Sequence, residues 1–229
     1  MADKTSHKRV NDILFGPLER PALQWLAAHM PAWMNPDLLT LIGIIGAFII
    51  FAGYVLSGSN PGFLWLASLG FVINWFGDSL DGTLARYRKI ERPKYGFFVD
   101  HTVDAFGQLW ILAGIGLSPY VSFSVAMLTL VGYLMMSVLV YVTTFVTGEF
   151  KISYGKLGPT EIRVIAILAN VAFFFGGIRT IEFSFGTYPV YDILILAIGL
   201  LLIGIFTVTT ASRAYKLSKI DERRTTEEK

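Results

Sequence analysis

The chain contains no cysteine and little charge. Because none of its 229 residues is cysteine, disulfide bonds and thiolate metal ligands are excluded. Charged residues make up 16% of the sequence, against about 25% in soluble domains, and the mean hydropathy is +0.57. The formal net charge of +2 is too small to indicate nucleic-acid binding, so we expect no nucleic-acid partner. This composition predicts an all-α polytopic membrane protein.

Six apolar runs follow one another along the chain, each close to the ~20 residues that a helix needs to cross a bilayer. They are Leu38–Leu56, Gly62–Leu84, Phe97–Leu117, Val121–Val146, Ile162–Gly177 and Val190–Ala211. No small-residue cleavage pattern precedes the first run, so we expect no removable signal peptide. The sequence therefore predicts six transmembrane helices.

The segment Asn11–Met30 mixes apolar and polar residues ahead of the first run, and Pro17 and Pro21 interrupt its pattern. This mixture predicts an amphipathic helix on the membrane surface, with a short soluble cap as the alternative. We therefore expect three parts along the chain. They are a cytoplasmic N-terminal amphipathic segment (1–36), a six-helix transmembrane domain (37–212) and a cytoplasmic charged tail (213–229).

Lysine and arginine gather on one side of the predicted bundle. Six spans place both termini and the second and fourth connections on that side, which carries Lys4, Lys8, Arg9, Arg20, Arg86, Arg88, Lys89, Arg92, Lys94, Lys151, Lys156, Arg163, Arg213, Lys216, Lys219, Arg223, Arg224 and Lys229. The opposite side holds only Arg179. By the positive-inside rule, the basic side faces the cytoplasm. The pattern predicts an integral protein of the cytoplasmic membrane.

Four aspartates lie near the cytoplasmic ends of the second and third spans: Asp78, Asp81, Asp100 and Asp104. One Asp at the centre of a membrane helix costs roughly 2.5–3.5 kcal/mol on insertion scales, so four together need compensation. At about 100° per residue, the first two share one helical face and the last two share another. Because the connection between the spans is short, these faces can meet and bind two hard cations. We expect this metal site to face the cytoplasm.

Two other interpretations of the aspartates remain open. The acids could form a proton or cation relay in a small cation-coupled transporter, or they could pair with Arg86 and Arg88. The small residues Gly82 and Ala85 favour a binding site, because they leave room for a ligand beside the carboxylates. Arg86 follows directly, where its guanidinium can reach a phosphate held by the metals.

The same residues resemble the signature of the CDP-alcohol phosphotransferases. That signature is D-x-x-D-G-x-x-A-R, a short gap, and G-x-x-x-D-x-x-x-D. This chain supplies Asp78, Asp81, Gly82, Ala85, Arg86, Gly96, Asp100 and Asp104, with nine residues between the two halves. One departure lies in Asn35–Thr40, where Asp37 takes a position at which the family often has Asn. The resemblance also extends to the layout of six spans behind a surface segment.

The resemblance implies an enzyme that moves a phospho-alcohol or phosphatidyl group from a CDP-linked donor to a hydroxyl and releases CMP. It implies that Asp78, Asp81 and Asp100 ligate two Mg²⁺ or Mn²⁺ ions, with Asp104 as a ligand or as the acceptor of a proton. The implied substrate-binding residues are Gly82, Ala85, Arg86 and Gly96. A lipid substrate and a homodimer are further implications.

The family has two branches, and short features of this chain resemble the branch that joins CDP-choline or CDP-ethanolamine to diacylglycerol. The features are the Asp100–His101 pair, the stretch Trp33–Pro36 and the start of the fifth span at Pro159–Glu161. In that branch His101 is a plausible general base for a lipid hydroxyl. His101 could equally face the membrane interface, since it lies about 100° round the helix from Asp100.

The other branch uses CDP-diacylglycerol with a polar alcohol, and a basic cluster near the fifth span is compatible with it. Lys151, Lys156 and Arg163 lie close to Thr160 at the expected helix start. Such a cluster could hold a phosphorylated polar acceptor. The same three charges could instead serve only the positive-inside distribution.

Overall fold

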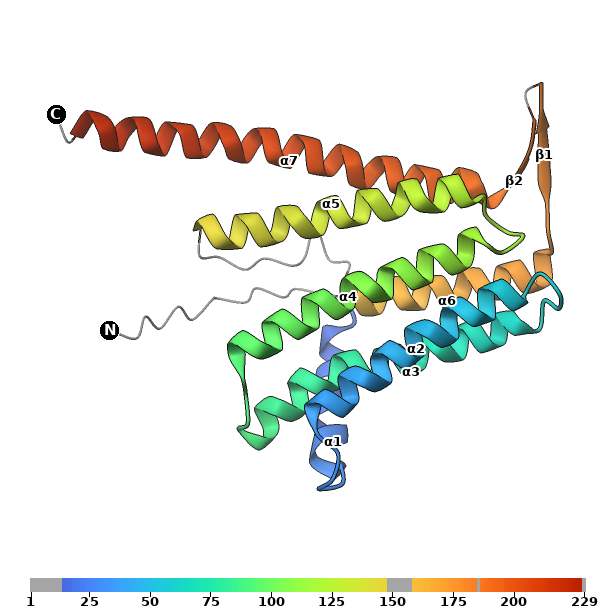
Figure 1. The fold of residues 1–229 in the computed structure, drawn as a ribbon, viewed down its shortest axis with the longest axis horizontal. Helices are drawn as coiled ribbons and strands as arrows, with labels where there is room; N and C mark the ends of the chain where they lie inside the picture. The colour runs from blue at the N-terminus through green and yellow to red at the C-terminus, as the bar shows by residue number, and fades with distance from the viewer. Residues whose placement is uncertain (1–13, 148–157, 185, 228–229) are drawn as a thin grey trace.

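The computed structural model describes residues 14–147, 158–184 and 186–227. Figure 1 shows long helices running side by side, with a shorter helix across one end. The elements in chain order are α1 (Gly16–His29), α2 (Pro36–Leu56), α3 (Phe63–Arg88), α4 (Pro93–Gly116), α5 (Phe123–Thr147), α6 (Pro159–Gly176), β1 (Thr180–Phe183), β2 (Gly186–Pro189) and α7 (Tyr191–Glu227). The predicted all-α membrane fold is confirmed.

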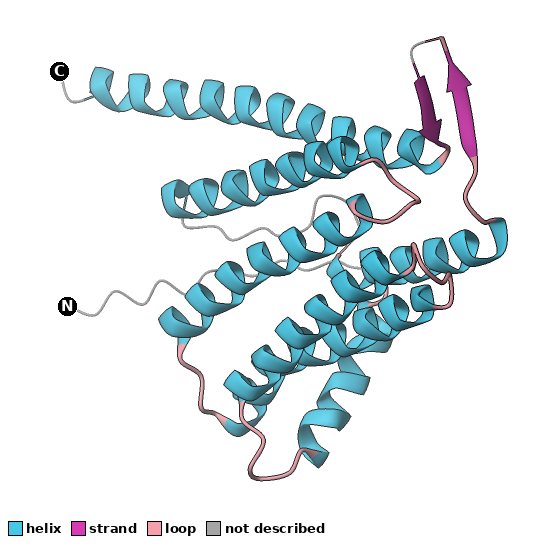
Figure 2. Cartoon of the chain, turned by 45° about the vertical axis from the view of Figure 1, so that its right-hand side comes forward, coloured by secondary structure: helices cyan, strands magenta, loops and turns pink. Residues whose placement is uncertain are grey.

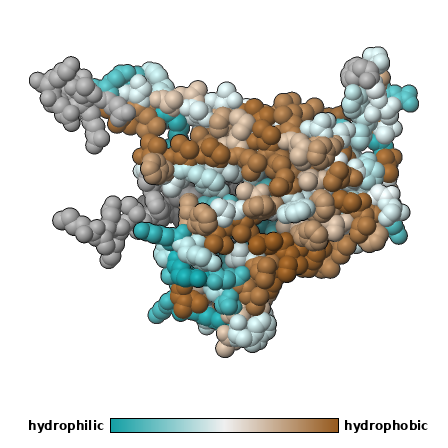
Figure 3. All heavy atoms as spheres, viewed as in Figure 1, coloured by the Kyte–Doolittle hydropathy of each residue, from teal (hydrophilic) through white to brown (hydrophobic). Residues whose placement is uncertain are grey.

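Each predicted span overlaps one of the helices α2 to α7, and α7 continues well beyond the predicted end at Ala211. Among the described residues, five helices are long and apolar enough to cross a membrane, and α4 is not one of them. At 24 residues α4 has the length, but Asp100, His101 and Asp104 lower its hydropathy. It lies beside α2 and α5 in the bundle. Figure 3 shows a broad apolar band over the middle of the molecule, as an integral membrane protein requires.

A short antiparallel hairpin, β1–β2, stands between α6 and α7, where the sequence indicated only a connection. Ile181 pairs with Tyr188, and Phe183 pairs with Gly186 beside the turn. β-branched and aromatic residues favour this pairing, but four residues per strand are too few for a clear alternating pattern. Figure 2 shows the hairpin in magenta beyond the helix ends.

The N-terminal helix α1 packs on α3 rather than only lying on a membrane surface. It begins with Pro17 in its first turn and continues through Pro21, so the prolines do not break it. Leu23 and Ala27 are buried in a cluster with residues of α2 and α3. Other apolar side chains of the helix, such as Trp25, remain exposed. Residues 11–13 of the predicted amphipathic segment lie outside the described part of the chain.

Helices α2 and α3 approach so closely that their backbones touch. A Cβ atom added to Gly77 would lie 2.3 Å from the Gly43 nitrogen and 2.4 Å from the Leu39 oxygen. Glycine permits this approach because it has no side chain. Gly43 therefore serves the packing of the two helices. The interlocked pair fixes where the carboxylates of α3 point.

Helix α4 is the link between two groups of helices. It contacts α2 on one side and α5 on the other, while α5 contacts α7. The α5–α7 pair is joined at one end by Ser122, whose N and Oγ donate to the Asp192 carboxylate at 2.7 and 2.5 Å. Further along, Thr129 Oγ1 donates to the Ile195 oxygen at 3.0 Å. The residues on α4 therefore lie between the two groups.

Candidate metal centre and active site

A cavity opens where α2, α3, α4 and α6 meet, and three of the four predicted metal ligands line it. Its polar lining includes Asp78, Asp100, Asp104, Asn74 and Arg163. The wall from α2 is made partly by Gly43 and Ala47, which leave space opposite the carboxylates. The structure thus brings together side chains that are far apart in the sequence.

Asp78 is held by a chain of hydrogen bonds that crosses three helices. Arg163 Nη2 on α6 donates to Asp78 Oδ2 at 2.6 Å, and Arg163 Nε donates to Asn74 Oδ1 at 2.9 Å. Asn74 Nδ2 in turn donates to the Gly43 oxygen on α2 at 2.9 Å. The charge-assisted pair offsets part of the cost of holding Asp78 inside the bundle.

Asp81 takes a different position from the other three aspartates. Its Oδ2 accepts a hydrogen bond from Thr40 Oγ1 of α2 at 2.7 Å, and its Oδ1 accepts one from the Gly82 nitrogen. Asp81 is not among the residues that line the cavity. It lies one helical turn from Asp78, close enough for the two charges to interact. Thr40 was not singled out by the sequence, which gives no sign that α2 contributes a donor here.

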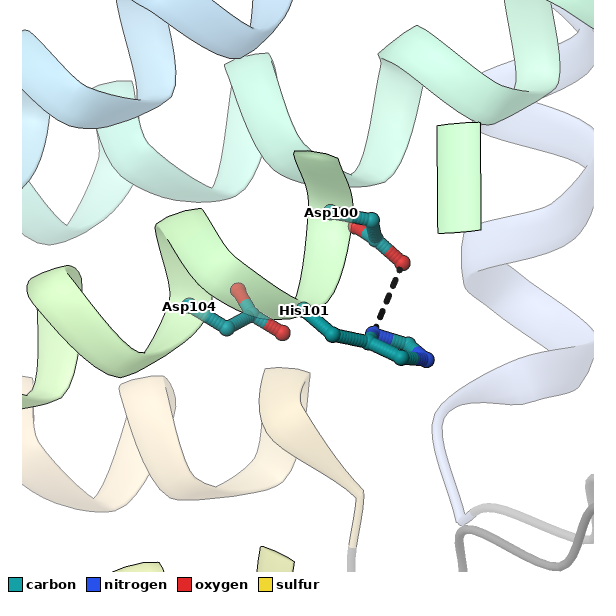
Figure 4. Close-up of side chains that lie close together, drawn as sticks. All are labelled: Asp100, His101 and Asp104. Carbon is teal, nitrogen blue, oxygen red and sulfur yellow. Dashed lines mark ion pairs between the residues drawn. The ribbon is translucent and has the colours of Figure 1, made fainter. Parts of the chain in front are cut away.

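Asp100, His101 and Asp104 form a compact group on one face of α4 (Figure 4). One ligand atom from each lies within 4.8 Å of the others, so the three could hold a metal ion. His101 Nδ1 lies 3.4 Å from Asp100 Oδ2. The two carboxylates and Asp78 are near enough for their charges to interact. The carboxylates of α4 are thus placed where they could bind a cation together with Asp78.

His101 does not face the membrane interface, which was one of its two expected positions. Its side chain is only 14% exposed, while that of Asp100 is 41% exposed. The imidazole stacks on Tyr141 of α5 at a centroid distance of 5.1 Å and meets the edge of Phe97 at 4.2 Å. These rings orient the imidazole beside the carboxylates of α4.

The predicted substrate-binding residues lie near the C-terminal end of α3 and the start of α4, and they are not part of the cavity lining. Arg86 folds back along α3, where its Nη2 donates to Thr83 Oγ1 at 3.2 Å. A Cβ at Gly82 would lie 3.3 Å from Arg86 Nη1, so the guanidinium covers that glycine. Ala85 is half-buried, and Gly96 is exposed with nothing within 4 Å of an added Cβ. This open end leaves room for a ligand next to the aspartates.

The residues present fit divalent cations. Three carboxylates line one cavity, where the charge of Asp104 is repelled by those of Asp78 and Asp100. One pairing arginine, Arg163, cannot neutralise them all. Carboxylate oxygens are the ligands that Mg²⁺ and Mn²⁺ prefer, and the cations would supply the missing positive charge.

The start of α6 is fixed by two acids that sequence reasoning did not assign. Glu161 is 2% exposed, and its Oε1 accepts from the Phe15 nitrogen at 2.7 Å. Glu19 of α1 accepts hydrogen bonds at 2.7 Å from both Trp75 Nε1 and Thr160 Oγ1. These bonds tie α1, α3 and α6 together just before Arg163. The basic residues Lys151 and Lys156 lie outside the described part of the chain.

The sequence matches the family model described as CDP-alcohol phosphatidyltransferase over residues 33–201. That range includes all eight signature positions and every residue of the cavity described above. The match therefore covers most of the bundle rather than one short motif.

Individual relatives show the same similarity. The chain is 25% identical to cholinephosphotransferase 1 of Homo sapiens over 188 residues, which cover 77% of this chain and 45% of the human protein. It is 37% identical to phosphatidylinositol phosphate synthase of Cutibacterium acnes over 91 residues, covering 39% and 41% of the two chains. Archaetidylinositol phosphate synthase of Pyrococcus horikoshii is 36% identical over 104 residues, covering 45% and 52%. The chain spans about half the length of these curated relatives.

Proposed function

The chain belongs to the CDP-alcohol phosphatidyltransferase family, and we propose that it transfers a phospho-alcohol or phosphatidyl group from a CDP-linked donor to a hydroxyl. The observation that carries this proposal is the convergence of Asp78, Asp100 and Asp104 on one cavity, within a region that matches the family. A small cation-coupled transporter is the competing class, because acids inside a membrane also serve ion pathways.

In the proposed reaction, the acceptor oxygen bonds to phosphorus while the bond to the CMP oxygen breaks. Asp78, Asp81 and Asp100 would hold two Mg²⁺ or Mn²⁺ ions, with Asp104 as a further ligand. When bound, the cations offset charge on the pyrophosphate and on departing CMP. The acceptor hydroxyl gives its proton to Asp104 or to His101. Asp81 would have to turn from Thr40 to join this set.

The remaining signature residues would position the donor. Arg86 would hold a donor phosphate, since its guanidinium already lies over Gly82 at the open end of the aspartate cluster. Gly82, Ala85 and Gly96 would leave space for the cytidine. Movement of Arg86 away from Thr83 is needed for this contact.

For the donor, we favour CDP-choline or CDP-ethanolamine with diacylglycerol as the acceptor. The support is the position of His101 beside Asp100, together with the extent of similarity to cholinephosphotransferase 1. The second candidate is CDP-diacylglycerol with a polar alcohol, as in the relatives named phosphatidylinositol phosphate synthase and archaetidylinositol phosphate synthase. The observation that favours this alternative is Arg163 in the cavity, where it could hold an acceptor phosphate.

The proposal also includes the protein's setting in the membrane. We propose that residues 1–36 and 213–229 lie in the cytoplasm, that 37–212 form the transmembrane domain, and that the aspartates face the cytoplasm. The asymmetry of lysine and arginine supports this orientation. The homodimer implied by family resemblance belongs to the same proposal.

Release of CMP by purified protein tests the function. The protein in detergent would be given Mg²⁺ or Mn²⁺ and one of three donors: CDP-diacylglycerol, CDP-choline or CDP-ethanolamine, each with its acceptor. We expect CMP from one donor class only. No CMP from any donor, together with cation uptake into vesicles, would favour the transporter.

Single substitutions of the carboxylates give a sharper test. Asp78→Asn, Asp81→Asn or Asp100→Asn removes a charged ligand while keeping the size of the side chain, so we expect CMP release to be lost. The matched control is Glu182→Gln, an exposed acid on β1, which should leave the rate unchanged. Substantial activity in any two of the aspartate variants at saturating metal would refute the metal site.

A further inference from the structure

Arg163 is held inside the bundle with one of its donors unused. Its side chain is 13% exposed, and Nη1 is buried without a hydrogen bond to any described residue. Nη2 binds Asp78 and Nε binds Asn74. An unused buried donor carries a desolvation cost, which a ligand in the cavity could relieve. Arg163 itself lines that cavity.

Arg163 also competes directly with a cation. Its Nη2 lies 2.6 Å from Asp78 Oδ2, so the guanidinium occupies one of the two oxygens that a divalent ion would bind. A metal ion ligated through that oxygen must displace the guanidinium. The bond from Nε to Asn74 need not break, because Asn74 is anchored separately to the Gly43 oxygen.

We propose that Arg163 is an exchangeable counter-ion: it neutralises Asp78 before a divalent cation binds and then turns to a phosphate oxygen in the same cavity. This inference rests on the proposed function, because that function supplies the cation and the phosphate. After the exchange, Nη1 and Nη2 both point from one guanidinium plane and can bind a phosphate in a bidentate manner. Asn74 serves as the pivot that keeps the arginine at the site.

The exchange has a thermodynamic consequence. Before any phosphate is present, Arg163 weakens cation binding because its bond to Asp78 must be broken. Once the cation is bound, the released guanidinium strengthens phosphate binding. Coupling between two ligands is reciprocal, so a phosphate ligand should tighten the cation by the same factor. Part of this coupling should depend on Arg163.

Mn²⁺ binding measured by the electron paramagnetic resonance signal of the free ion tests the exchange without any turnover. The protein in detergent would be titrated with Mn²⁺ alone, then with CDP present, and then with glycerol 3-phosphate present. CDP represents the donor's phosphates, and glycerol 3-phosphate represents a phosphorylated acceptor. We expect Arg163→Gln to bind Mn²⁺ alone about tenfold more tightly than the unmodified chain, the effect of one lost charge-assisted bond. In this variant, the phosphate ligand that Arg163 would contact should no longer tighten Mn²⁺ binding.

Two further variants separate exchange from a general loss of charge. Arg86→Gln removes the same charge near Asp81 but breaks no bond to Asp78, so its gain in Mn²⁺ affinity should be clearly smaller. Arg163→Lys keeps the charge without the planar fork, so it should retain weak Mn²⁺ binding and lose much of the coupling. This variant serves if the Gln variant cannot be purified.

The outcomes distinguish this inference from the proposed function. Mn²⁺ affinity that is unchanged in Arg163→Gln, or raised equally in Arg86→Gln, would overturn the exchange. Full coupling with both phosphate ligands in Arg163→Lys would also overturn it. If the unmodified chain binds no Mn²⁺, or if Asp78→Asn binds it equally well, the metal site in the proposed function fails instead.

Discussion

Three of the four aspartates of the site have different partners. Asp78 is paired with Arg163, Asp81 is bound by Thr40, and Asp100 lies against His101. These partners come from three different helices, α6, α2 and α4. Substitutions of single residues should therefore have separable effects on metal binding, donor binding and proton transfer.

A substitution of His101 should most clearly separate an effect on proton transfer from effects on metal and donor binding. If the acceptor is diacylglycerol, its neutral hydroxyl needs a base beside the metals, and loss of a general base typically costs about 10²–10⁴-fold in rate. We expect His101→Ala to lower turnover with CDP-choline or CDP-ethanolamine by about this factor. Binding of Mn²⁺ and CDP should remain. The measurement is CMP release by the variant with each donor.

Tyr141→Phe is the matched control for that substitution, because it keeps the ring that stacks on His101 and changes no nitrogen. Its rate should stay near that of the unmodified chain. A mild effect of His101→Ala together with activity on CDP-choline or CDP-ethanolamine would contradict the catalytic role of His101. If CDP-diacylglycerol is the donor, Asp104 can serve a polar alcohol and the substitution should be mild.

The acidic residues of the site could be predicted because charge inside an apolar run is costly and therefore conspicuous. Helical periodicity then placed Asp78 and Asp81 on one face and Asp100 and Asp104 on another. The Arg163–Asp78 pair could not be predicted, because it depends on how α6 packs beside α3. Thr40 was missed for the same reason: a threonine is common in membrane helices, and only the approach of α2 makes it a donor to Asp81.

The α2–α3 pair sets the geometry of the site at the level of whole helices. Gly43 of α2 lies against Asp78 of α3: a Cβ on that glycine would be 3.3 Å from the Asp78 nitrogen. The close approach also allows Asn74 to reach the Gly43 oxygen. A small widening of this helix pair should therefore displace the carboxylate as well as weaken the fold.

Gly77→Ala tests this dependence. The added methyl would lie 2.3 Å from the Gly43 nitrogen, which forces the two backbones apart. Overpacking of this kind typically costs about 1–3 kcal/mol of stability. We expect a lower melting temperature in detergent and reduced Mn²⁺ binding. The measurements are a thermal unfolding curve and a metal titration.

Gly204→Ala provides the comparison, because a Cβ at this position on α7 meets nothing within 4 Å. Alanine has the better helix propensity, so this variant should be as stable as the unmodified chain or slightly more stable. Equal melting temperatures and equal Mn²⁺ affinities for the two variants would contradict the role given to the glycine contact.

Most helices could be predicted from the sequence, and other elements could not. Runs of about 20 apolar residues leave few alternatives to a membrane helix. The hairpin was missed because each strand has only four residues. The docking of α1 on α3 depends on Leu23 and Ala27 meeting a surface that forms only in the folded bundle. The residue pattern within one segment does not reveal which other segment it packs against.

At the scale of the whole molecule, the proposed orientation can be checked with single cysteines, since the chain has none of its own. Ser59→Cys would place a thiol on the exposed α2–α3 connection, and Glu91→Cys would place one on the exposed α3–α4 connection. We expect an impermeant thiol reagent to label the first in intact cells. It should label the second only after the membrane is permeabilised.

A cysteine at position 57 is the control that shows whether the reagent labels only exposed thiols. Ser57 is 2% exposed, so Ser57→Cys should react slowly from either side although it lies next to the connection. The reverse labelling pattern for Ser59→Cys and Glu91→Cys would invert the orientation. It would then place the aspartates away from the cytoplasm.

Helix α7 runs unbroken from Tyr191 to Glu227, which is 37 residues. At 1.5 Å per residue it is about 55 Å long, whereas the hydrocarbon core of a bilayer is about 30 Å thick. The last part of α7 therefore continues past the lipid as a stiff rod that shares the axis of the membrane segment. A helical protein fused to the end of α7, so that the helix continues without a break, would show the tilt of the membrane segment. The rod would thus give electron microscopy a fixed landmark outside the detergent micelle.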